Sequence, residues 1–272
     1  MPPVSKPPRL HLLPAMRAPR CVVIARVRAK VWHILEWDLR SGVLEAGSWF
    51  RGSFYPMRCD VSWDGKYMVY LATNFARPYE EATWNGVCQP PWLRTVVHRP
   101  NIGAWNGGGV FTEAKTLAWN LPWGGEFVPG GVPLPFQSTD LGGPRGEDLT
   151  VVFPRFERDG WSFDEETETW SRRPSQKHPM VRARYAGFFS GESHPARRTG
   201  YVVEFSVDER PDLLSNATEW AAWDARGNLL WAEKGWLHRA RPEDILEGKP
   251  PLQSIDLTGL EPPPARSESG VA

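Results

Sequence analysis

The chain has 272 residues, and its 32 basic and 32 acidic side chains give a formal net charge of zero at pH 7. This balance disfavours a general binder of nucleic acid or of anionic membranes, since both functions need a concentrated basic field. No stretch approaches the roughly 20 consecutive apolar residues of a membrane-spanning helix. The sequence therefore predicts neither a nucleic acid nor a membrane as a partner.

The N-terminal residues 1–19 are predicted to form an irregular leader with one short strand from Leu10 to Leu13. Prolines interrupt this segment, and it has no continuous apolar run, so it does not fit a secretory signal. We therefore expect a cytoplasmic location. At the other end, residues 261–272 are polar and rich in proline, a composition typical of disorder.

The sequence between these ends, residues 20–260, is predicted to form a single all-β domain. Helix formers are sparse in the chain, which holds 25 glycines and 27 prolines. Glycine supplies tight turns and proline breaks helices, so many short strands are expected. The predicted strands are Cys21–Val27, Val31–Trp37, Val43–Phe50, Tyr67–Thr73, Arg94–His98, Gly109–Phe111, Lys115–Trp119, Leu149–Phe153, Val181–Phe189, Tyr201–Val207 and Asn228–Ala232.

Two further segments depart from this strand pattern. Residues 121–148 hold three glycine pairs and five prolines, and a loop of this length inside a domain is often functional. The segment from Arg241 to Gly248 is the one predicted helix. Its Pro242 suits the first helical turn, and its glycine suits the position after the last turn.

An aromatic residue followed by Asp or Asn and then by Gly recurs along the chain. The copies are Trp37-Asp38 with Gly42, Trp63-Asp64-Gly65, Trp84-Asn85-Gly86, Trp105-Asn106-Gly107, and Trp223-Asp224 with Gly227. Asp or Asn next to Gly favours the tight turn of a β-hairpin, because both residues tolerate a positive φ. The interval of 42 residues between Trp63 and Trp105 is also typical of a propeller blade.

Within this pattern, the segment from Asp60 to Leu71 resembles the strand-turn-strand unit of WD-repeat and TolB-type β-propeller blades. The segment from Trp223 to Trp231 is a looser copy, and the one from Ala104 to Phe111 resembles uncharacterised bacterial proteins. No segment has a complete Gly-His…Trp-Asp signature. The resemblance implies a β-propeller of about five irregular blades, with a β-sandwich or barrel as the alternative. The expected blades are residues 20–55, 56–100, 101–147, 148–208 and 216–258.

The residue types that carry catalysis or bind metals are scattered in this sequence. The six histidines have no paired spacing, and Cys21, Cys59 and Cys88 are too far apart for a metal-binding pair. We expect these cysteines to be free, buried thiols. The Gly107-Gly108-Gly109 run lacks the Lys-Ser/Thr of a phosphate-binding loop. The sequence therefore predicts no cofactor, no metal site and no catalytic residue.

Tryptophans, with neighbouring glycines and prolines, gather between residues 84 and 123. Aromatic side chains on loops are used to bind flat ligands, sugars or protein partners, whereas buried ones pack the core between blades. Both interpretations stay open. The predicted ligand-binding residues are Trp84, Asn85, Trp92, Arg94, Arg99, Trp105 and Asn106.

These observations favour a non-enzymatic binding module or scaffold in a bacterial cytoplasm. Its expected partner is another protein or a small polar ligand. The alternative is a carbohydrate-active or other hydrolase with a tryptophan-lined loop face. Such an enzyme would need carboxylates, for which Asp140, Glu147 and Asp148 are the candidates.

Overall fold

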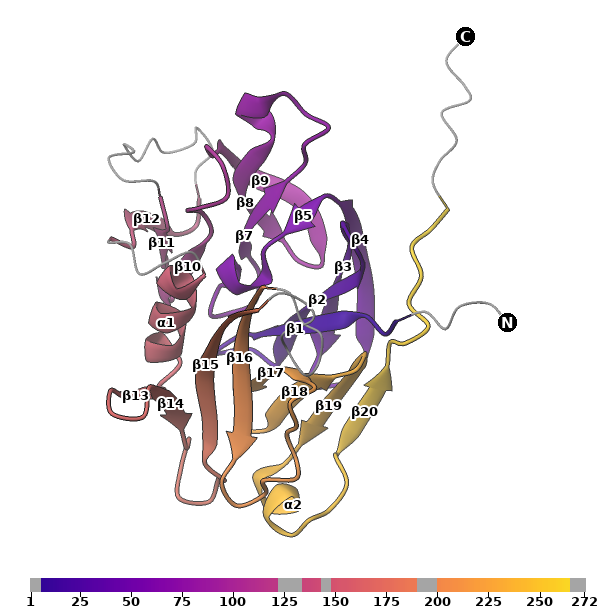
Figure 1. The fold of residues 1–272 in the computed structure, drawn as a ribbon, viewed down its shortest axis with the longest axis vertical. Helices are drawn as coiled ribbons and strands as arrows, with labels where there is room; N and C mark the ends of the chain where they lie inside the picture. Colours follow the sequence, from indigo (N-terminus) through magenta and orange to yellow (C-terminus); the bar gives the residue numbers. More distant parts are fainter. Residues whose placement is uncertain (1–5, 122–133, 143–147, 190–199, 265–272) are drawn as a thin grey trace.

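The computed structural model describes residues 6–121, 134–142, 148–189 and 200–264, with Gly200 and Tyr201 described only by their backbone. Its strands form five small sheets, which are arranged as the five blades of a β-propeller (Figure 1). Helices are few and short. The predicted fold class, an all-β propeller of about five blades, is confirmed.

The blades follow one another in chain order. The first consists of β1 (Arg9–Pro14), β2 (Arg20–Arg28), β3 (Val31–Asp38) and β4 (Leu44–Arg51). The second consists of β5 (Ser53–Phe54), β6 (Asp60–Val61), β7 (Met68–Thr73), β8 (Thr83–Gln89) and β9 (Trp92–Pro100). It also contains two short 3-10 helices, η1 (Pro56–Arg58) and η2 (Tyr79–Glu81).

The remaining blades complete the ring. The third consists of β10 (Gly109–Glu113), β11 (Thr116–Trp119) and β12 (Gln137–Asp140), of which the last two are parallel. The fourth consists of β13 (Ser162–Asp164), β14 (Thr169–Arg172), β15 (Val181–Phe189) and β16 (Gly200–Val207). The fifth consists of β17 (Thr218–Trp223), β18 (Leu229–Glu233), β19 (Trp236–Ala240) and β20 (Gln253–Asp256). Helix α1 (Leu149–Arg158) joins the third blade to the fourth, and α2 (Pro242–Leu246) lies between β19 and β20.

The aromatic-Asx-Gly pattern forms hairpin turns in some places and not in others. At Asp64 the prediction is confirmed, because its Oδ1 accepts hydrogen bonds from the Ser62 hydroxyl (2.7 Å) and the Lys66 N–H (3.2 Å). Gly65 in this turn has a φ of 74°. The prediction is wrong at Trp84-Asn85-Gly86, which lies inside β8. There, Gly86 leaves room for the Tyr70 ring of the neighbouring strand, which a Cβ would meet at 2.3 Å.

The prediction of a strand at Leu149–Phe153 is also wrong, because this segment begins α1. Adjacent β-branched residues, Val151 and Val152, favoured a strand locally. In the folded chain both valines are buried together with Phe156, a spacing that suits one face of a helix. Tertiary burial thus decides the secondary structure here. The one predicted helix, from Arg241 to Gly248, is confirmed as α2.

Helix α1 carries two arginines whose buried side chains contact several blades. The Arg155 Nη1 donates to the Cys59 carbonyl of the second blade (2.6 Å). Its guanidinium also lies over the Trp220 ring of the fifth blade, 5.0 Å from the centroid, and its Nη2 is 3.5 Å from Nε2 of His11 in the first blade. One side chain therefore contacts three blades.

The second arginine, Arg158, joins the second blade to the third. Its Nη1 donates to the carboxylate of Asp60 and to the Phe111 carbonyl (3.1 Å). The other bond that Asp60 accepts comes from the Phe111 N–H (2.8 Å). Burial raises the pKa of the Asp60 carboxyl, while the charges of Arg158 and Arg155 oppose that rise.

We expect Asp60→Ala to lower the free energy of unfolding by about 3–5 kcal/mol, because it leaves the Phe111 N–H without its acceptor and the buried Arg158 with Asp159 as its remaining carboxylate. Asp208→Ala is the matched control: it breaks the exposed pair with Arg182, which is worth at most about 1 kcal/mol. Urea unfolding of both variants measures the difference. If both variants lose the same small amount of unfolding free energy, the Arg158–Asp60 pair does not hold the blades together.

Candidate functional site

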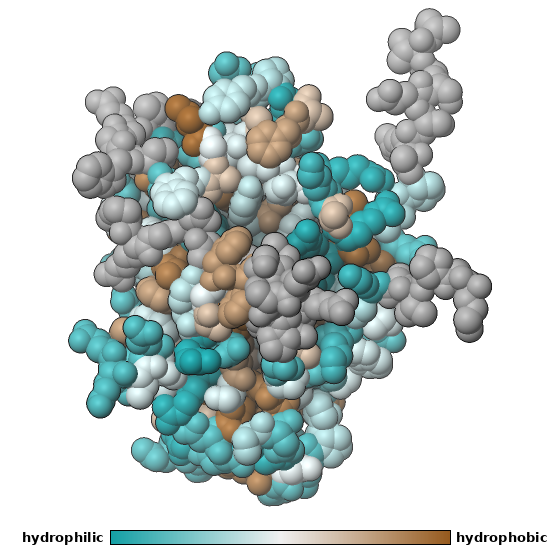
Figure 2. All heavy atoms as spheres, viewed as in Figure 1, coloured by the Kyte–Doolittle hydropathy of each residue, from teal (hydrophilic) through white to brown (hydrophobic). Residues whose placement is uncertain are grey.

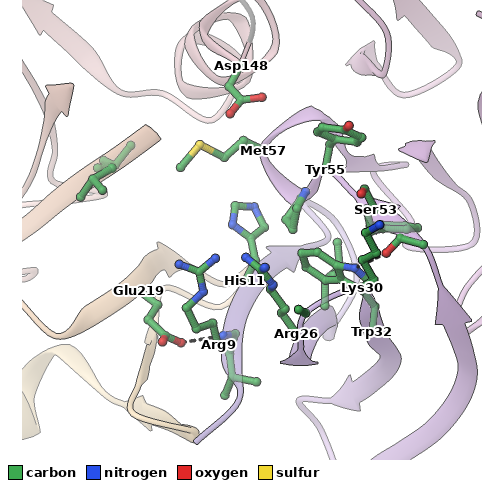
Figure 3. Close-up of a pocket in the computed structure, with 18 of the residues that line it drawn as sticks. Arg9, His11, Arg26, Lys30, Trp32, Ser53, Tyr55, Met57, Asp148 and Glu219 are labelled. Atoms are coloured by element: carbon green, nitrogen blue, oxygen red, sulfur yellow. Dashed lines mark hydrogen bonds between the residues drawn. The ribbon is translucent and has the colours of Figure 1, made fainter. Parts of the chain in front are cut away.

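A cavity of about 510 Å³ is lined by residues of the first, second, fourth and fifth blades and by Asp148. This volume suits a small-molecule ligand. Its wall is formed by β1 and β2, the β2–β3 turn, the segment from Gly52 to Met57, the start of α1, and side chains of β15, β16 and β17. Figure 3 shows the side chains that line it.

Two arginines on neighbouring strands face each other in this wall. Arg9 of β1 and Arg26 of β2 are directly opposite in the antiparallel ladder, and in the close-up their guanidinium groups lie side by side (Figure 3). Burial, and in addition the charge of Arg9, lower the pKa of Arg26. Within the described part of the chain neither arginine forms an ion pair. Like charges directly opposite on a sheet are destabilising, so the fold tolerates this arrangement at a cost.

A third cation, Lys30, stands on the rim of the cavity in the two-residue turn between β2 and β3. Its φ of 57° lies in the left-handed region, which is uncommon for a residue other than glycine. The Lys30 carbonyl accepts a hydrogen bond from the Gly52 N–H (2.9 Å), which fixes the turn against the second blade. The backbone therefore holds this lysine at the rim.

Two acidic residues line the same cavity, and both have partners. Asp148, just before α1, pairs with the buried Arg58 (Nε to Oδ1, 2.8 Å). Glu219 accepts a hydrogen bond from the Leu10 N–H (2.5 Å). With Asp148 neutralised by Arg58, Glu219 is the one other carboxylate among the described residues that line the cavity, against the three cations Arg9, Arg26 and Lys30. The described lining therefore carries an excess of positive charge.

His11 also lines the cavity, and its ring lies tilted against Trp220 with a centroid distance of 4.0 Å. Burial, and in addition the charge of Arg155, lower the pKa of His11 well below 6.5. The imidazole is therefore neutral at neutral pH, and it adds no charge to the cavity.

Aromatic side chains line the cavity next to Arg26, whose direct partner in the β2–β3 ladder is Trp32. Trp32 packs near Phe54, with ring centroids 6.1 Å apart, and its Nε1 donates to the Gly52 carbonyl (3.0 Å). The Arg26 guanidinium lies 5.5 Å from the centre of the Trp32 ring, which joins the charged and apolar walls. A ligand here would meet positive charge and aromatic surface next to each other.

The residues predicted from the sequence lie elsewhere, and two of them are buried. Trp84 packs in the core of the second blade, with its Nε1 3.4 Å from the Tyr70 hydroxyl. The Asn85 Oδ1 accepts a hydrogen bond from the Gly108 N–H (2.6 Å). These two positions correspond to the packing interpretation, which the sequence left open.

The other predicted residues are divided between the two ends of the β8–β9 hairpin. Trp92 and Arg94 are exposed near one end, where Gln89 pairs with Trp92. Arg99 lies near the other end, with its guanidinium 5.8 Å from the Trp119 ring centre. The loop that follows holds Trp105 and Asn106. The structure therefore does not bring the seven residues together into one site.

That loop, residues 101–108, is held rigidly by hydrogen bonds to its backbone. Arg58 Nη1 donates to the carbonyls of Ala104 (2.7 Å) and Trp105 (2.8 Å), and Asn101 Nδ2 donates to those of Gly103 and Asn106 (both 2.9 Å). The Trp105 side chain is nevertheless 63% exposed. Figure 2 shows hydrophobic side chains at the surface over this end of the second blade, at the top of the view.

The basic cavity was not predicted from the sequence, because Arg9 fell in the presumed leader and Arg26 near the end of the predicted strand Cys21–Val27. The alternation of Arg9, Leu10 and His11 is the signal that could have placed two polar side chains on one face of a strand. That Arg26 lies opposite Arg9 follows only from the register of β1 and β2.

The candidate carboxylates of a hydrolase are not assembled within the described residues. Asp140 is exposed at the end of β12, Asp148 is paired with Arg58, and Glu147 lies outside the residues that the structure describes, as does most of the glycine-rich segment 121–148.

The three cysteines are free and buried, as expected, and burial raises the pKa of each thiol. In the described ranges, no three His, Cys, Asp or Glu side chains gather as ligands for a metal. No helix in those ranges is long and apolar enough to cross a membrane.

The neutral state of His11 predicts how stability depends on pH. Below about pH 6.5 the unfolded chain takes up a proton at this residue that the folded chain does not, so wild-type stability falls on acidification. In His11→Gln this contribution disappears. The free energy of unfolding, measured with urea between pH 7 and pH 5, should fall less steeply with decreasing pH in the variant than in the wild type. The difference in slope should be up to about 1.4 kcal/mol per pH unit. Parallel profiles would contradict the burial of a neutral imidazole.

No protein-family model matches the sequence, and no curated protein matches it. Among solved structures, the chain is similar to one described in a structural and mechanistic study of two prolyl endopeptidases. The identity is 11% and the TM-score is 0.30. The match covers 92% of this chain but 36% of that one, so this chain spans little more than a third of the length of its structural neighbour.

Proposed function

We propose that the protein is a non-enzymatic binding module of the bacterial cytoplasm, whose basic cavity holds a small anionic ligand with an apolar body. The observation that carries this proposal is the opposed pair of Arg9 and Arg26, which line the cavity without an acidic partner among the described residues.

An anion between the two guanidinium groups would turn a repulsion into two attractions. Arginine offers a planar fork of donors that matches a carboxylate or a phosphate, and such charge-assisted hydrogen bonds are about twice as strong as neutral ones. The aromatic wall at Trp32 and Phe54 would take the apolar part of the same molecule. Both features favour one ligand that is charged at one end and apolar at the other.

The cavity favours binding over hydrolysis because its protonatable groups already have fixed structural partners. Asp148 is held by Arg58, and His11 is held between Trp220 and Arg155. Ser53 lines the cavity, yet no described His, Asp or Glu forms a hydrogen bond with its hydroxyl. A nucleophile needs a base within hydrogen-bonding reach.

The direct test uses phenyl phosphate as the anionic, apolar probe, with inorganic phosphate and phenol as its separate halves. Calorimetry at constant ionic strength should show that phenyl phosphate binds more tightly than either half. Arg9→Gln should weaken this binding by about 10- to 100-fold, since it removes one charge-assisted contact. The same change should leave the unliganded fold as stable as before, or up to about 1 kcal/mol more stable, because the like-charge pair is gone.

Arg184→Gln is the matched control, because Arg184 is an exposed arginine that pairs with Glu204 outside this cavity. It should bind phenyl phosphate as the wild type does. Wild-type affinity in Arg9→Gln, or no binding of any probe to the wild type, would refute the proposal.

The exposed loop of residues 101–108 favours a second candidate function, the docking of a protein partner on Trp105 and its neighbour Ile102, which is 81% exposed. Exposed aromatic side chains on a rigid support are typical of interface hot spots. Trp105 and Asn106, two of the seven ligand-binding residues predicted from the sequence, belong to this loop.

For this surface, we expect Trp105→Ala to change the free energy of unfolding by less than about 1 kcal/mol while it weakens capture of a protein partner. Trp84→Ala is the matched control, because loss of the buried Trp84 ring should lower the free energy of unfolding by about 3–5 kcal/mol. Chemical unfolding and a pull-down compare the two variants. If the Trp105→Ala variant is unfolded, or if it captures the partner as well as the wild type does, the loop is not a docking site.

A further inference from the structure

The charge of the basic cavity distinguishes between the two anions that an arginine pair can bind, a carboxylate and a phosphate. Apart from the neutralised Asp148, the described lining holds the carboxylate of Glu219 and three cations, which are Arg9, Arg26 and Lys30. Two positive charges are therefore in excess in this lining. A carboxylate carries one negative charge, whereas a phosphate monoester carries about two at pH 7. The excess charge thus matches a phosphate monoester.

The third cation, Lys30, is connected to the arginine pair through one aromatic ring. The Arg26 guanidinium lies over the Trp32 ring, and the Trp32 Nε1 donates to the Gly52 carbonyl (3.0 Å). The Gly52 N–H in turn donates to the Lys30 carbonyl (2.9 Å). A lysine ammonium group sits on a flexible stem, so the Lys30 side chain is able to turn toward an anion beside Arg26.

The Lys30 side chain has no structural task in the described part of the chain. It is exposed, and its ammonium group forms no ion pair or hydrogen bond with a described residue. Its φ of 57° is a conformation that glycine and asparagine adopt more readily than lysine. Lys234, which has a φ of 49° in the turn between β18 and β19, instead pairs with Glu233. The charge of Lys30 is therefore available to a ligand.

Hydroxyl groups add donors that suit the third oxygen of a phosphate. Ser53 and Tyr55 line the cavity, and neither hydroxyl forms a hydrogen bond with a described residue. In the close-up, Ser53 lies on the same side of the cavity as Lys30, away from Glu219 (Figure 3). A carboxylate offers two acceptor oxygens, which the two arginine forks already satisfy, whereas a phosphate monoester offers three. The hydroxyl donors therefore also favour a phosphate.

We infer that the ligand of the basic cavity is a small, soluble phosphate monoester, and that Lys30 determines the preference for it over singly charged anions. Arg9 and Arg26 bind the phosphate oxygens, and the Lys30 ammonium group compensates the second negative charge. The aromatic side chains beside Arg26 contact the ester group. The inference rests on the proposed function, because the phosphate occupies the anion site between the two arginines.

Phenyl sulfate is the probe that isolates the second charge. It has the tetrahedral shape of phenyl phosphate, but it carries a single negative charge. Calorimetry at about pH 7.5, where a phosphate monoester is a dianion, compares the two probes. The wild type should bind phenyl phosphate at least about tenfold more tightly than phenyl sulfate. Equal affinities of the wild type for the two probes would overturn the inference.

Two variants of Lys30 remove its charge without strain, because glycine and asparagine both tolerate its backbone conformation. Lys30→Gly and Lys30→Asn should keep the wild-type melting temperature. Coulomb energy scales with the charge of the ligand, so phenyl phosphate should lose about tenfold in affinity and phenyl sulfate only about threefold. Lys234→Gly is the matched control, and it should bind both probes as the wild type does. Equal losses for the two probes in both Lys30 variants would overturn the role of Lys30.

The same monoester group also occurs on a lipid, phosphatidic acid. Vesicles of equal parts phosphatidylcholine and phosphatidic acid test this source in a sedimentation assay. We expect the protein to stay in the supernatant, because the anion site lies inside a cavity that four blades line. Sedimentation with these vesicles that is lost in Arg9→Gln would overturn the soluble ligand in favour of a lipid headgroup.

Failure of the inference and failure of the proposed function give different results. If only the inference fails, phenyl phosphate and phenyl sulfate bind with equal affinity, and both still bind more weakly to Arg9→Gln. If the proposed function fails, neither probe binds, or Arg9→Gln binds both as well as the wild type does.

Discussion

The buried contact between Arg158 of α1 and Asp60 of β6 is the interaction on which the rest of this propeller depends. A five-bladed ring needs its inner strands held together, and here a helix supplies the connection with cationic side chains. Arg158 joins the second and third blades, and Arg155 reaches the first, second and fifth. Each guanidinium binds backbone carbonyls as well as charged or aromatic groups. Isolated charges would be too costly at this depth, so these contacts must form together.

The same helix links the core to the proposed binding surfaces. Asp148, at its start, lines the basic cavity and pairs with Arg58. Arg58 in turn holds the backbone of the loop that presents Trp105. In the cavity wall, burial and the charge of Arg155 together lower the pKa of His11 and keep its ring neutral. The site is therefore supported by the core, which suits a preformed pocket that binds its ligand without large rearrangement.

Local chemistry made parts of this structure predictable from the sequence. The turn at Asp64 depends on residues within four positions of each other, so its motif was enough to place it, and the short strands followed from Gly and Pro. The helix at Val151 and Val152 was missed because burial against other blades, rather than local propensity, decides it. The pair of Arg9 and Arg26 was missed because only the β1–β2 register brings them together.

The central functional claim is that the fold holds Arg9 and Arg26 opposite each other in order to receive an anion. Anomalous diffraction from a crystal soaked in sodium bromide tests this claim most directly, because the ion is located without any assumption about the natural ligand. The account predicts a bromide peak within about 3.5 Å of guanidinium nitrogens from both arginines. A carboxylate of the chain lying between the two groups, with no bromide there, would contradict it.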